Sequence, residues 1–250
     1  VPQVFGEGAG AAAWVPAPWL LPAALVSAAI GFIGVFAARS LSEQAAYAVI
    51  GSTGTLLIAV AGWSAESLGA ALYYLVHSTL AGAALFLVAD VAARRRGAYA
   101  DNAAPGPAFA GRGVAAMLFM VAAIAAAGLP PLSGFIGKLL ILQAVAPMPD
   151  WGWAWAWGVI LGTTLIGVIG FARAGSAVFW QSVESEAPAP TATARASGTP
   201  RDLVAPALAL ALLAALSAGA GPASGYAMAA AAQVLDPAAS AAVVLTENAR

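Results

Sequence analysis

The fold of this chain is decided by a break inside a long apolar run, in the stretch Ala127-Gly128-Leu129-Pro130-Pro131-Leu132-Ser133-Gly134-Phe135-Ile136-Gly137-Lys138-Leu139-Leu140. The run covers Val114–Ala146, and its 33 residues exceed the length of one ordinary membrane-spanning helix, which needs about 20. Two prolines lack the backbone donor that a helix requires, and the flanking Gly128 and Gly134 loosen the backbone. We therefore predict one interrupted span, non-helical around Pro130–Ser133, with helical pieces that are each too short to cross alone.

The only lysine of the chain, Lys138, lies about one turn after this break. Interrupted helices persist at membrane depth where the freed backbone groups face protein or a wet cavity, and an ionisable group there marks an ion or proton site. An amine at that depth can exchange a proton, because desolvation disfavours its charged form. A second interpretation is a lysine at a helix end that reaches the headgroups, with the prolines in a plain loop. The uncharged stretches Val114–Ala125 and Leu139–Ala146 favour the first interpretation.

Composition predicts a membrane protein in contact with a lipid bilayer. Of the 250 residues, 62% are hydrophobic and 8% are charged, and the mean hydropathy is +0.87. A soluble domain carries about 25% charged residues. The net charge of −1 argues against a nucleic acid partner. With no cysteine and one histidine, we expect no metal site and no haem built by this chain, and no motif indicates another cofactor.

The hydropathy pattern predicts an all-α, polytopic transmembrane helix bundle of about six spans. The expected spans are residues 19–38, 45–63, 68–91, 114–146 with its break, 155–179 and 203–218. In the second span, Gly51 and Gly54 are small residues that allow close helix packing. The alanine-rich tail, residues 221–250, is compatible with a short interfacial helix but shows no clear amphipathic face.

The arginines predict the orientation of the spans. With six spans, one side collects eight of the nine arginines: Arg39, Arg94, Arg95, Arg96, Arg112, Arg173, Arg195 and Arg201. Because basic loops stay in the cytoplasm, both ends of the chain are expected to face away from it. The acids Glu43, Glu66 and Asp90 lie near span ends and are interpreted as interfacial charges.

His77, the only histidine, lies inside the third span. An imidazole accepts and donates protons near neutral pH, which suits a proton relay with Lys138. The alternative is a neutral histidine that hydrogen-bonds to a neighbouring helix. Five hydroxyl side chains could line a wet path, although each taken singly also fits helix packing or a bond to its own backbone: Tyr47, Ser52, Thr53, Ser78 and Thr79.

Two stretches together resemble a known family. They are the histidine segment Tyr74-Leu75-Val76-His77-Ser78-Thr79-Leu80-Ala81-Gly82-Ala83-Ala84-Leu85-Phe86-Leu87 and, later, the segment from Gly128 to Lys138. In this order they resemble the antiporter-type subunits shared by respiratory complex I and Mrp-type cation/proton antiporters, and most of all the D-type subunit of the Mrp complex. The likeness covers about residues 18–179 and corresponds to the C-terminal half of such a subunit.

The resemblance implies two inverted five-helix repeats, each with a broken helix whose lysine passes protons. Lys138 corresponds to the lysine of the second broken helix, and His77 corresponds to the histidine of the helix before it. The first repeat is not in this sequence, and the position near Gly82, a lysine in many relatives, is uncharged here. The resemblance further implies other membrane subunits of an antiporter complex as partners, protons and Na⁺ or K⁺ as transported ions, and the inner (plasma) membrane of a bacterium as the location.

The expected organisation divides the chain into four parts. They are a non-cytoplasmic loop at 1–18, a second antiporter-type repeat of five spans at 19–180, a polar cytoplasmic loop at 181–202, and a final span with its tail at 203–250. The chain begins at Val1 with no initiator methionine and no signal-peptide pattern, so we expect a piece of a longer polypeptide.

Three functions remain open at this point. The first is a proton-translocating half-module of a multisubunit cation/proton antiporter. The second is the homologous module of a NADH-quinone oxidoreductase or membrane hydrogenase complex. The third is a structural membrane subunit without transport. No nucleophile–base pair or phosphate-binding loop indicates an enzyme of the soluble type, which favours a transporter subunit.

Overall fold

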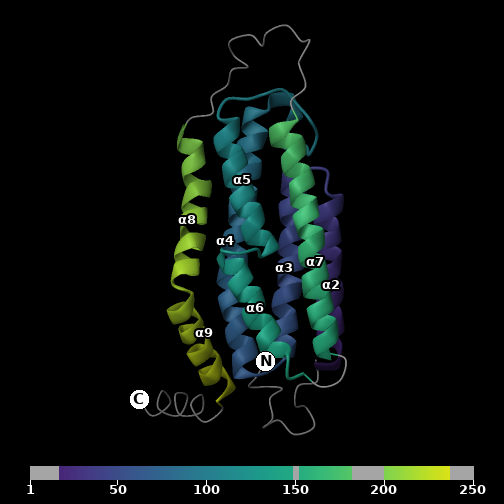
Figure 1. Ribbon diagram of the computed structural model, residues 1–250, viewed down its shortest axis with the longest axis vertical. Coiled ribbons are helices and arrows are strands. Elements are labelled where there is room, and N and C mark those ends of the chain that lie inside the picture. Colours follow the sequence, from purple (N-terminus) through teal and green to yellow (C-terminus); the bar gives the residue numbers. More distant parts are fainter. Residues whose placement is uncertain (1–16, 149–151, 182–199, 237–250) are drawn as a thin grey trace, which may run out of the picture.

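The computed structural model describes residues 17–148, 152–181 and 200–236, and these residues form helices without strands. The helices stand side by side in one elongated bundle (Figure 1). Their bounds are α2 Ala17–Ala37, α3 Leu41–Ala61, α4 Ala65–Arg95, η2 Gly97–Tyr99, α5 Arg112–Ala127, α6 Ser133–Val145, α7 Gly152–Gly175, η3 Ser176–Trp180, η4 Pro200–Leu203, α8 Val204–Ala218 and α9 Ala220–Leu235. The predicted all-α transmembrane bundle is confirmed.

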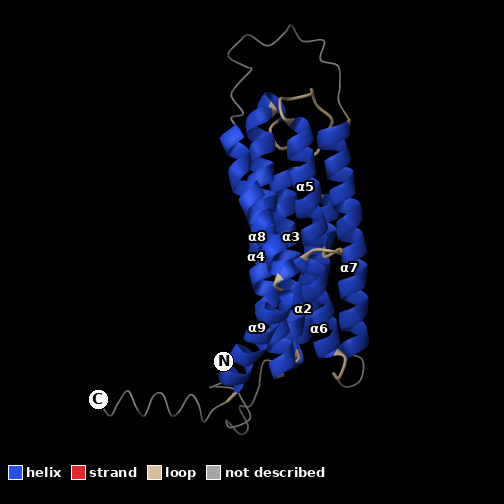
Figure 2. Cartoon of the chain, turned by 60° about the vertical axis from the view of Figure 1, so that its left-hand side comes forward, coloured by secondary structure: helices blue, strands red, loops and turns tan. Residues whose placement is uncertain are grey.

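Five helical segments are long and apolar enough to cross a membrane: Trp19–Ala37, Leu41–Ala61, Ala65–Arg95, Gly152–Trp180 and Arg201–Ala218. The helices α5 and α6 are shorter, with 16 and 13 residues. At 1.5 Å per residue they reach about 24 and 20 Å, less than the hydrocarbon thickness of about 30 Å. They lie end to end along the bundle, with a loop between them at mid-height (Figure 2). Together they form the predicted interrupted span.

The break lies between Gly128 and Leu132. Gly128 ends α5 in the left-handed region, with φ of 77°, which a residue with a Cβ adopts only with strain. Its N–H donates to the carbonyls of Ile124 and Ala125, at 3.1 and 2.9 Å. The prediction of a non-helical segment around Pro130–Ser133 needs one correction, because Leu132 caps α6 and Ser133 is already helical.

Small residues let the first two helices touch through their backbones, as predicted. A Cβ added at Gly31 of α2 would lie 2.1 Å from the backbone nitrogen of Gly51 on α3, and one added at Gly54 would lie 2.3 Å from the backbone nitrogen of Ala28. Backbones at this separation leave no room for side chains between them, so α2 and α3 form a fixed wall of the bundle.

One end of the bundle gathers the arginines of the described residues and is called the arginine end below. Arg173, at the last turn of α7, donates to the carbonyls of Phe36 and Ala38 at the end of α2. Arg95, at the end of α4, lies 3.8 Å from Asp202, which precedes α8. The predicted grouping of basic residues on one side is therefore present, and Arg195 lies outside the described residues.

The loop after α4 folds over the start of α3 at the arginine end. The Arg96 guanidinium is 4% exposed and donates to the carbonyls of Asn102 and Ala104, both at 2.6 Å. Asp101 accepts hydrogen bonds from the hydroxyl and the backbone N–H of Ser42, in the first turn of α3. A carboxylate at this position is favoured by the helix dipole, so the loop fixes where α3 begins.

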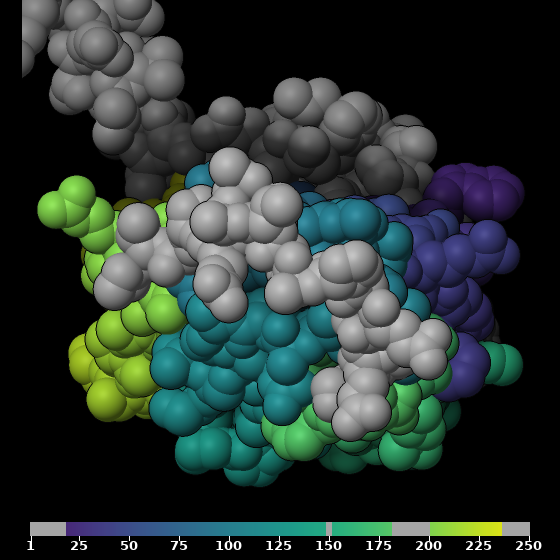
Figure 3. Space-filling view, turned by 90° about the horizontal axis from the view of Figure 1, so that it is seen from above, coloured from purple at the N-terminus to yellow at the C-terminus, as the bar shows by residue number. Residues whose placement is uncertain are grey.

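The last two helices follow each other along one edge of the bundle. Viewed from the arginine end (Figure 3), the yellow-green segment lies on the side away from the purple and blue α2 and α3. A Cβ at Gly69 of α4 would lie 2.7 Å from the Met228 side chain of α9, so α9 packs along α4. The tail was expected to be compatible with an interfacial helix, but up to Leu235 it forms a helix that packs against the bundle. Residues 237–250 lie outside the described residues.

The buried apolar side chains fall into two clusters along the bundle. The arginine-side cluster includes Phe32, Val88 and Phe119, and the opposite cluster includes Ile58 and Ile141. Polar side chains are buried around the break, between these clusters: His77, Ser133, Lys138 and Thr163. The fold therefore places a polar layer at mid-depth with apolar packing above and below it.

Candidate functional site

Lys138 lies on α6 and turns back across the break. Its side chain is 4% exposed, and Nζ donates to the carbonyl of Ala127, the last residue of α5, at 2.8 Å. A second hydrogen bond of 2.7 Å joins Nζ to the Thr164 hydroxyl on α7. The amine lies 5.0 Å from the centre of the Phe32 ring on α2. Three other segments of the chain, α5, α7 and α2, thus hold the amine through neutral groups.

The break itself makes room for this lysine. A Cβ added at Gly128 would lie 2.7 Å from Cδ and 3.1 Å from Nζ of Lys138. Because Gly128 ends α5 and has no side chain, the lysine reaches the carbonyl of Ala127, one of the last carbonyls of that helix, which lack a partner within it. An ammonium at the C-terminal end of a helix is also stabilised by the helix dipole. The proline–glycine stretch therefore creates an acceptor site for a cation at mid-depth.

His77 lies on α4 and contacts the other side of the break. The imidazole is 1% exposed, and its Nδ1 shares a hydrogen bond of 3.0 Å with the hydroxyl of Ser133, the first residue of α6. A Cβ added at Gly134 would lie 2.7 Å from His77 Nε2 and 2.3 Å from the carbonyl oxygen of Ala125. Gly134 is therefore needed for the histidine to approach.

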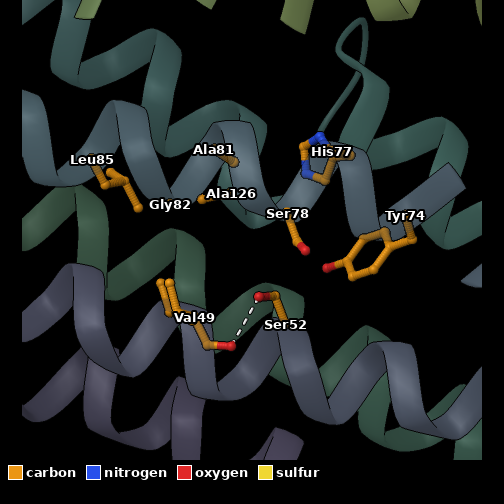
Figure 4. Close-up of a pocket in the computed structure, with 10 residues that line it drawn as sticks. Val49, Ser52, Tyr74, His77, Ser78, Ala81, Gly82, Leu85 and Ala126 are labelled. Atoms are coloured by element: carbon orange, nitrogen blue, oxygen red, sulfur yellow. Dashed lines mark hydrogen bonds between the residues drawn. The ribbon is translucent and has the colours of Figure 1, made fainter. Parts of the chain in front are cut away.

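A small cavity of about 10 Å³ lies beside His77 between α3 and α4 (Figure 4). That volume corresponds to about one water molecule. Ser52 from α3 and Ser78 from α4 line it, together with Tyr74, whose hydroxyl is buried. Within the described residues, the Tyr74 hydroxyl has no hydrogen-bond partner. Three hydroxyl-bearing side chains thus line a water-sized space to which His77 also contributes.

The five hydroxyl residues singled out from the sequence are not all brought together. Ser52 and Ser78 line the cavity, although each also donates to a carbonyl of its own helix. Thr53 and Thr79 are exposed on the outer surface, and their hydroxyls donate to Val49 and Leu75. Tyr47 is half-buried and packs over Gly34 of α2, outside the cavity lining.

Two contacts of the amine were not predicted from the sequence. Thr164 and its neighbour Thr163 are the hydroxyl residues of α7, and this pair in an otherwise apolar span was an available signal. Phe32 gives no signal of its own, because it is one of many large apolar residues in α2. Its role depends on which face of α2 points inward, which the pattern of that helix leaves open.

The acids of the described residues do not neutralise Lys138. Glu43, Glu66 and Asp90 are exposed, as expected for charges near span ends, and the ion pairs seen in the described residues belong to Arg94 and Arg95. In the same part of the chain, no group of three or more histidine, aspartate or glutamate side chains is arranged for a metal. An amine that is held by neutral groups alone is chemically suited to proton exchange, because no carboxylate fixes its charge.

A multi-pass helix bundle with a buried lysine at a broken helix is the architecture of a membrane module that handles protons or ions. The family model described as "NADH:quinone oxidoreductase/Mrp antiporter, TM" matches residues 9–167. The chain belongs to this family, as the resemblance indicated.

Two similar proteins are named as D-type subunits of cation/proton antiporters. The D-type subunit of a probable K⁺/H⁺ antiporter from Rhizobium meliloti is 34% identical over 214 residues, which cover 74% of this chain and 39% of that protein. The D-type subunit of a Na⁺/H⁺ antiporter from Bacillus subtilis is 34% identical over 125 residues, covering 50% and 24%. The matched region thus spans less than half of these relatives.

The fold is similar to that of subunits in two solved complexes. A chain of the Mrp complex from Dietzia sp. DQ12-45-1b superimposes with a TM-score of 0.69 at 21% identity, covering 90% of this chain and 49% of that one. A chain of respiratory complex I from Thermus thermophilus gives a TM-score of 0.72 at 23% identity, with 88% and 45% covered. At this level of identity, the likeness shows a shared fold.

Proposed function

We propose that this chain is the proton-translocating C-terminal half of a membrane subunit in a monovalent cation/proton antiporter, with residues 19–180 as its second antiporter-type repeat. The observation that carries the proposal is the environment of Lys138. Its amine is buried at the break and is held by the Ala127 carbonyl and the Thr164 hydroxyl. A lysine that serves only packing is a poor choice here, because a charge at mid-bilayer costs at least ~2.5–3.5 kcal/mol on insertion scales.

The neutral surroundings support proton exchange by this amine. A carboxylate partner would hold the ammonium as a fixed ion pair, whereas two neutral oxygens stabilise the charge only moderately. Apolar side chains are packed on both sides of the polar layer that contains the amine. Hydration of the amine from one side then favours the charged form, and loss of that water favours release of the proton.

His77 is proposed as the partner of Lys138 in a relay. The lysine binds the last residue of α5, whereas the histidine binds Ser133, the first residue of α6. The two groups therefore flank the same break, and the water-sized space beside His77 extends the polar layer toward α3. An imidazole that exchanges a proton with Ser133 or with water can pass charge onward, which an amide or apolar residue cannot do.

The names of the relatives support K⁺ or Na⁺ as the exchanged cation and other membrane subunits as partners. We further propose that the bacterial plasma membrane holds the complex, with the arginine end in the cytoplasm. Reporter domains fused after Arg96 and after Pro149 should then report opposite sides of the membrane. Reports from the same side would exclude this orientation.

The proposal is tested by replacing Lys138 in the complete complex. Lys138→Ala should abolish cation/proton exchange, measured as the pH change inside inverted vesicles after addition of Na⁺ or K⁺. His77→Gln should lower exchange strongly, because glutamine can bond to Ser133 but does not carry a proton. Leu139→Ala is the matched control, because Leu139 is the next residue of α6 and is 40% exposed.

Assembly of each variant is checked by co-purification of the subunits before exchange is compared. Normal exchange by a fully assembled Lys138→Ala complex would remove the proposal. Normal exchange by the His77→Gln complex would exclude His77 from the relay but would not contradict the role of Lys138.

A second candidate is the same module in a redox-driven complex, because the family description also names NADH:quinone oxidoreductase. The proton chemistry of Lys138 would be the same there, with the driving force supplied by other subunits. The two candidates are separated by the subunits that co-purify with the full-length protein and by whether added cations or electron donors drive the proton movement.

A further inference from the structure

The side chains of Gln44, Phe32 and Lys138 contact α7 at three successive levels between the arginine end and the break. Gln44 donates its amide Nε2 to the carbonyl of Gly170, at 3.1 Å. One turn closer to the break, Gly167 faces the Phe32 ring. After another turn, Thr164 accepts a hydrogen bond from the Lys138 amine. Because positions 170, 167 and 164 are three residues apart, successive levels are separated by about 4.5 Å.

The Phe32 ring is held in a slot between two glycines. A Cβ added at Gly51 of α3 would lie 2.6 Å from Cδ2 of the ring, and one added at Gly167 of α7 would lie 2.9 Å from Cδ1. The ring is fully buried. It therefore fills the space between α3 and α7 at the level directly above the amine, where any side chain larger than hydrogen on either wall would displace it.

Polar groups lie on both sides of this ring. On the side of the break, the Lys138 amine is 5.0 Å from the ring centre, within the range of a cation–π interaction. On the side of the arginine end, Gln44 is 1% exposed. Its Nε2 donates to the carbonyls of Val35 and Gly170, while its Oε1 is buried and accepts no hydrogen bond from the described residues. A buried amide oxygen of this kind is normally satisfied by water.

We propose that Phe32 is a positioning residue that closes the route between Lys138 and water at Gln44. In its slot the ring holds the ammonium through its face and separates it from the arginine end. When the ring leaves the slot, water at Gln44 reaches the amine, and the proton exchanges with that end. This inference rests on the proposed function, because it assigns the side from which Lys138 loads or releases its proton.

The test measures water access to position 138 in the membrane-embedded full complex. The 250 residues contain no cysteine, so Lys138→Cys introduces a single thiol into this part of the protein. A membrane-impermeant maleimide is added on the side of the arginine end, and the labelled peptide is identified by mass spectrometry. With Phe32 in place, labelling should be slow. With Phe32→Ala, it should be about tenfold faster, because the opening of a buried site controls its reaction rate.

Two further variants separate a closing role from general loosening of the bundle. Phe119→Ala removes another buried phenylalanine ring, on α5, and should leave labelling unchanged. Gly167→Leu added to Phe32→Ala places a new side chain into the space of the lost ring and should restore slow labelling. If Phe32→Ala fails to assemble, Phe32→Leu replaces it and should give a smaller increase in rate.

Equal labelling with Phe32, Phe32→Ala and Phe32→Leu would overturn the proposal, as would a similar increase with Phe119→Ala. This measurement does not require Lys138 to carry protons, because the lysine is replaced. A failure of the closing role is therefore distinguished from a failure of the proposed function, which the exchange activity of Lys138→Ala decides separately.

Discussion

Lys138 and Arg96 are two buried cations in different regions of the molecule, and their surroundings differ. Each residue is 4% exposed, and neither forms an ion pair in the described residues. Lys138 lies at mid-depth and binds two neutral oxygens from two helices. Arg96 lies at the arginine end and donates to the carbonyls of Ala100, Asn102 and Ala104, all in one loop.

The comparison shows that burial of a cation alone does not indicate proton chemistry. Burial lowers the pKa of Arg96, and the nearby Asp101 opposes that shift. A guanidinium starts from so high a value that it stays charged, and its planar set of donors matches several carbonyls at once. Arg96 therefore serves to fix a loop. An amine has a lower starting pKa and fewer fixed contacts, so burial favours the proton exchange that we propose for Lys138.

The largest expected effect on exchange comes from placing an arginine, the residue type of the Arg96 site, at position 138. Lys138→Arg should lose exchange completely, because arginine stays protonated at any accessible pH and its larger head does not fit the space beside Gly128. The measurement is the pH change in inverted vesicles, normalised to the amount of assembled complex. Substantial exchange by this variant would show that the site needs only a positive charge.

Arg96→Ala should reduce stability rather than exchange. Removal of the guanidinium leaves the carbonyls of Ala100 and Ala104 without a donor, at a cost of about 1–3 kcal/mol if they stay buried, whereas the Asn102 carbonyl still accepts from the Ala104 N–H. Thermal unfolding of the purified protein measures the loss, and exchange per assembled complex should stay near normal. Arg94→Ala is the control, because Arg94 is exposed and forms only a surface pair with Asp90. Equal effects of the two substitutions would contradict this prediction.

Thr164→Val should lower exchange by about fivefold, the equivalent of about 1 kcal/mol for one lost hydrogen bond to the amine. Valine keeps the shape of threonine, so the packing of α7 against α6 is preserved. Thr163→Val is a close control, because the Thr163 hydroxyl bonds only to Ile160 of its own helix. We expect Thr164→Val to exchange more slowly than Thr163→Val when the rates are normalised to the amount of assembled complex. Two variants with the same exchange rate would exclude Thr164 as a partner of Lys138.

Asp101→Ala should give the smallest effect, a loss of stability of about 1 kcal/mol, comparable to removal of a helix cap. Burial tends to raise the pKa of Asp101, but hydrogen bonds from the Ser42 hydroxyl and N–H hold it below its ordinary value. The carboxylate therefore stabilises the fold fully at neutral pH and loses this contribution as the pH falls below about 4. Unfolding of both proteins across this range should show a difference that shrinks with acidity, and a difference that grows would contradict the assignment.

The sequence by itself determined the class of fold and the position of the break. Prolines and glycines in an apolar run of this length favour an interrupted span over a plain loop, since the helix loses its backbone donors there and uncharged residues continue on both sides. The sequence also indicated Lys138 and His77, because a single ionisable residue in an apolar span stands out without any knowledge of packing. The grouping of the arginines followed from the number of spans.

Only the tertiary structure decided which side chains meet around the lysine. In helices that are apolar on every side, the pattern of residues does not reveal the inward face, so Phe32 and Thr164 could not be selected from their neighbours. For the same reason Thr53 and Thr79 were considered for a path, yet they lie on the outer surface. Contacts between helices depend on how glycine positions such as Gly51 and Gly167 set the approach of backbones and rings, and those approaches arise only when the helices pack together.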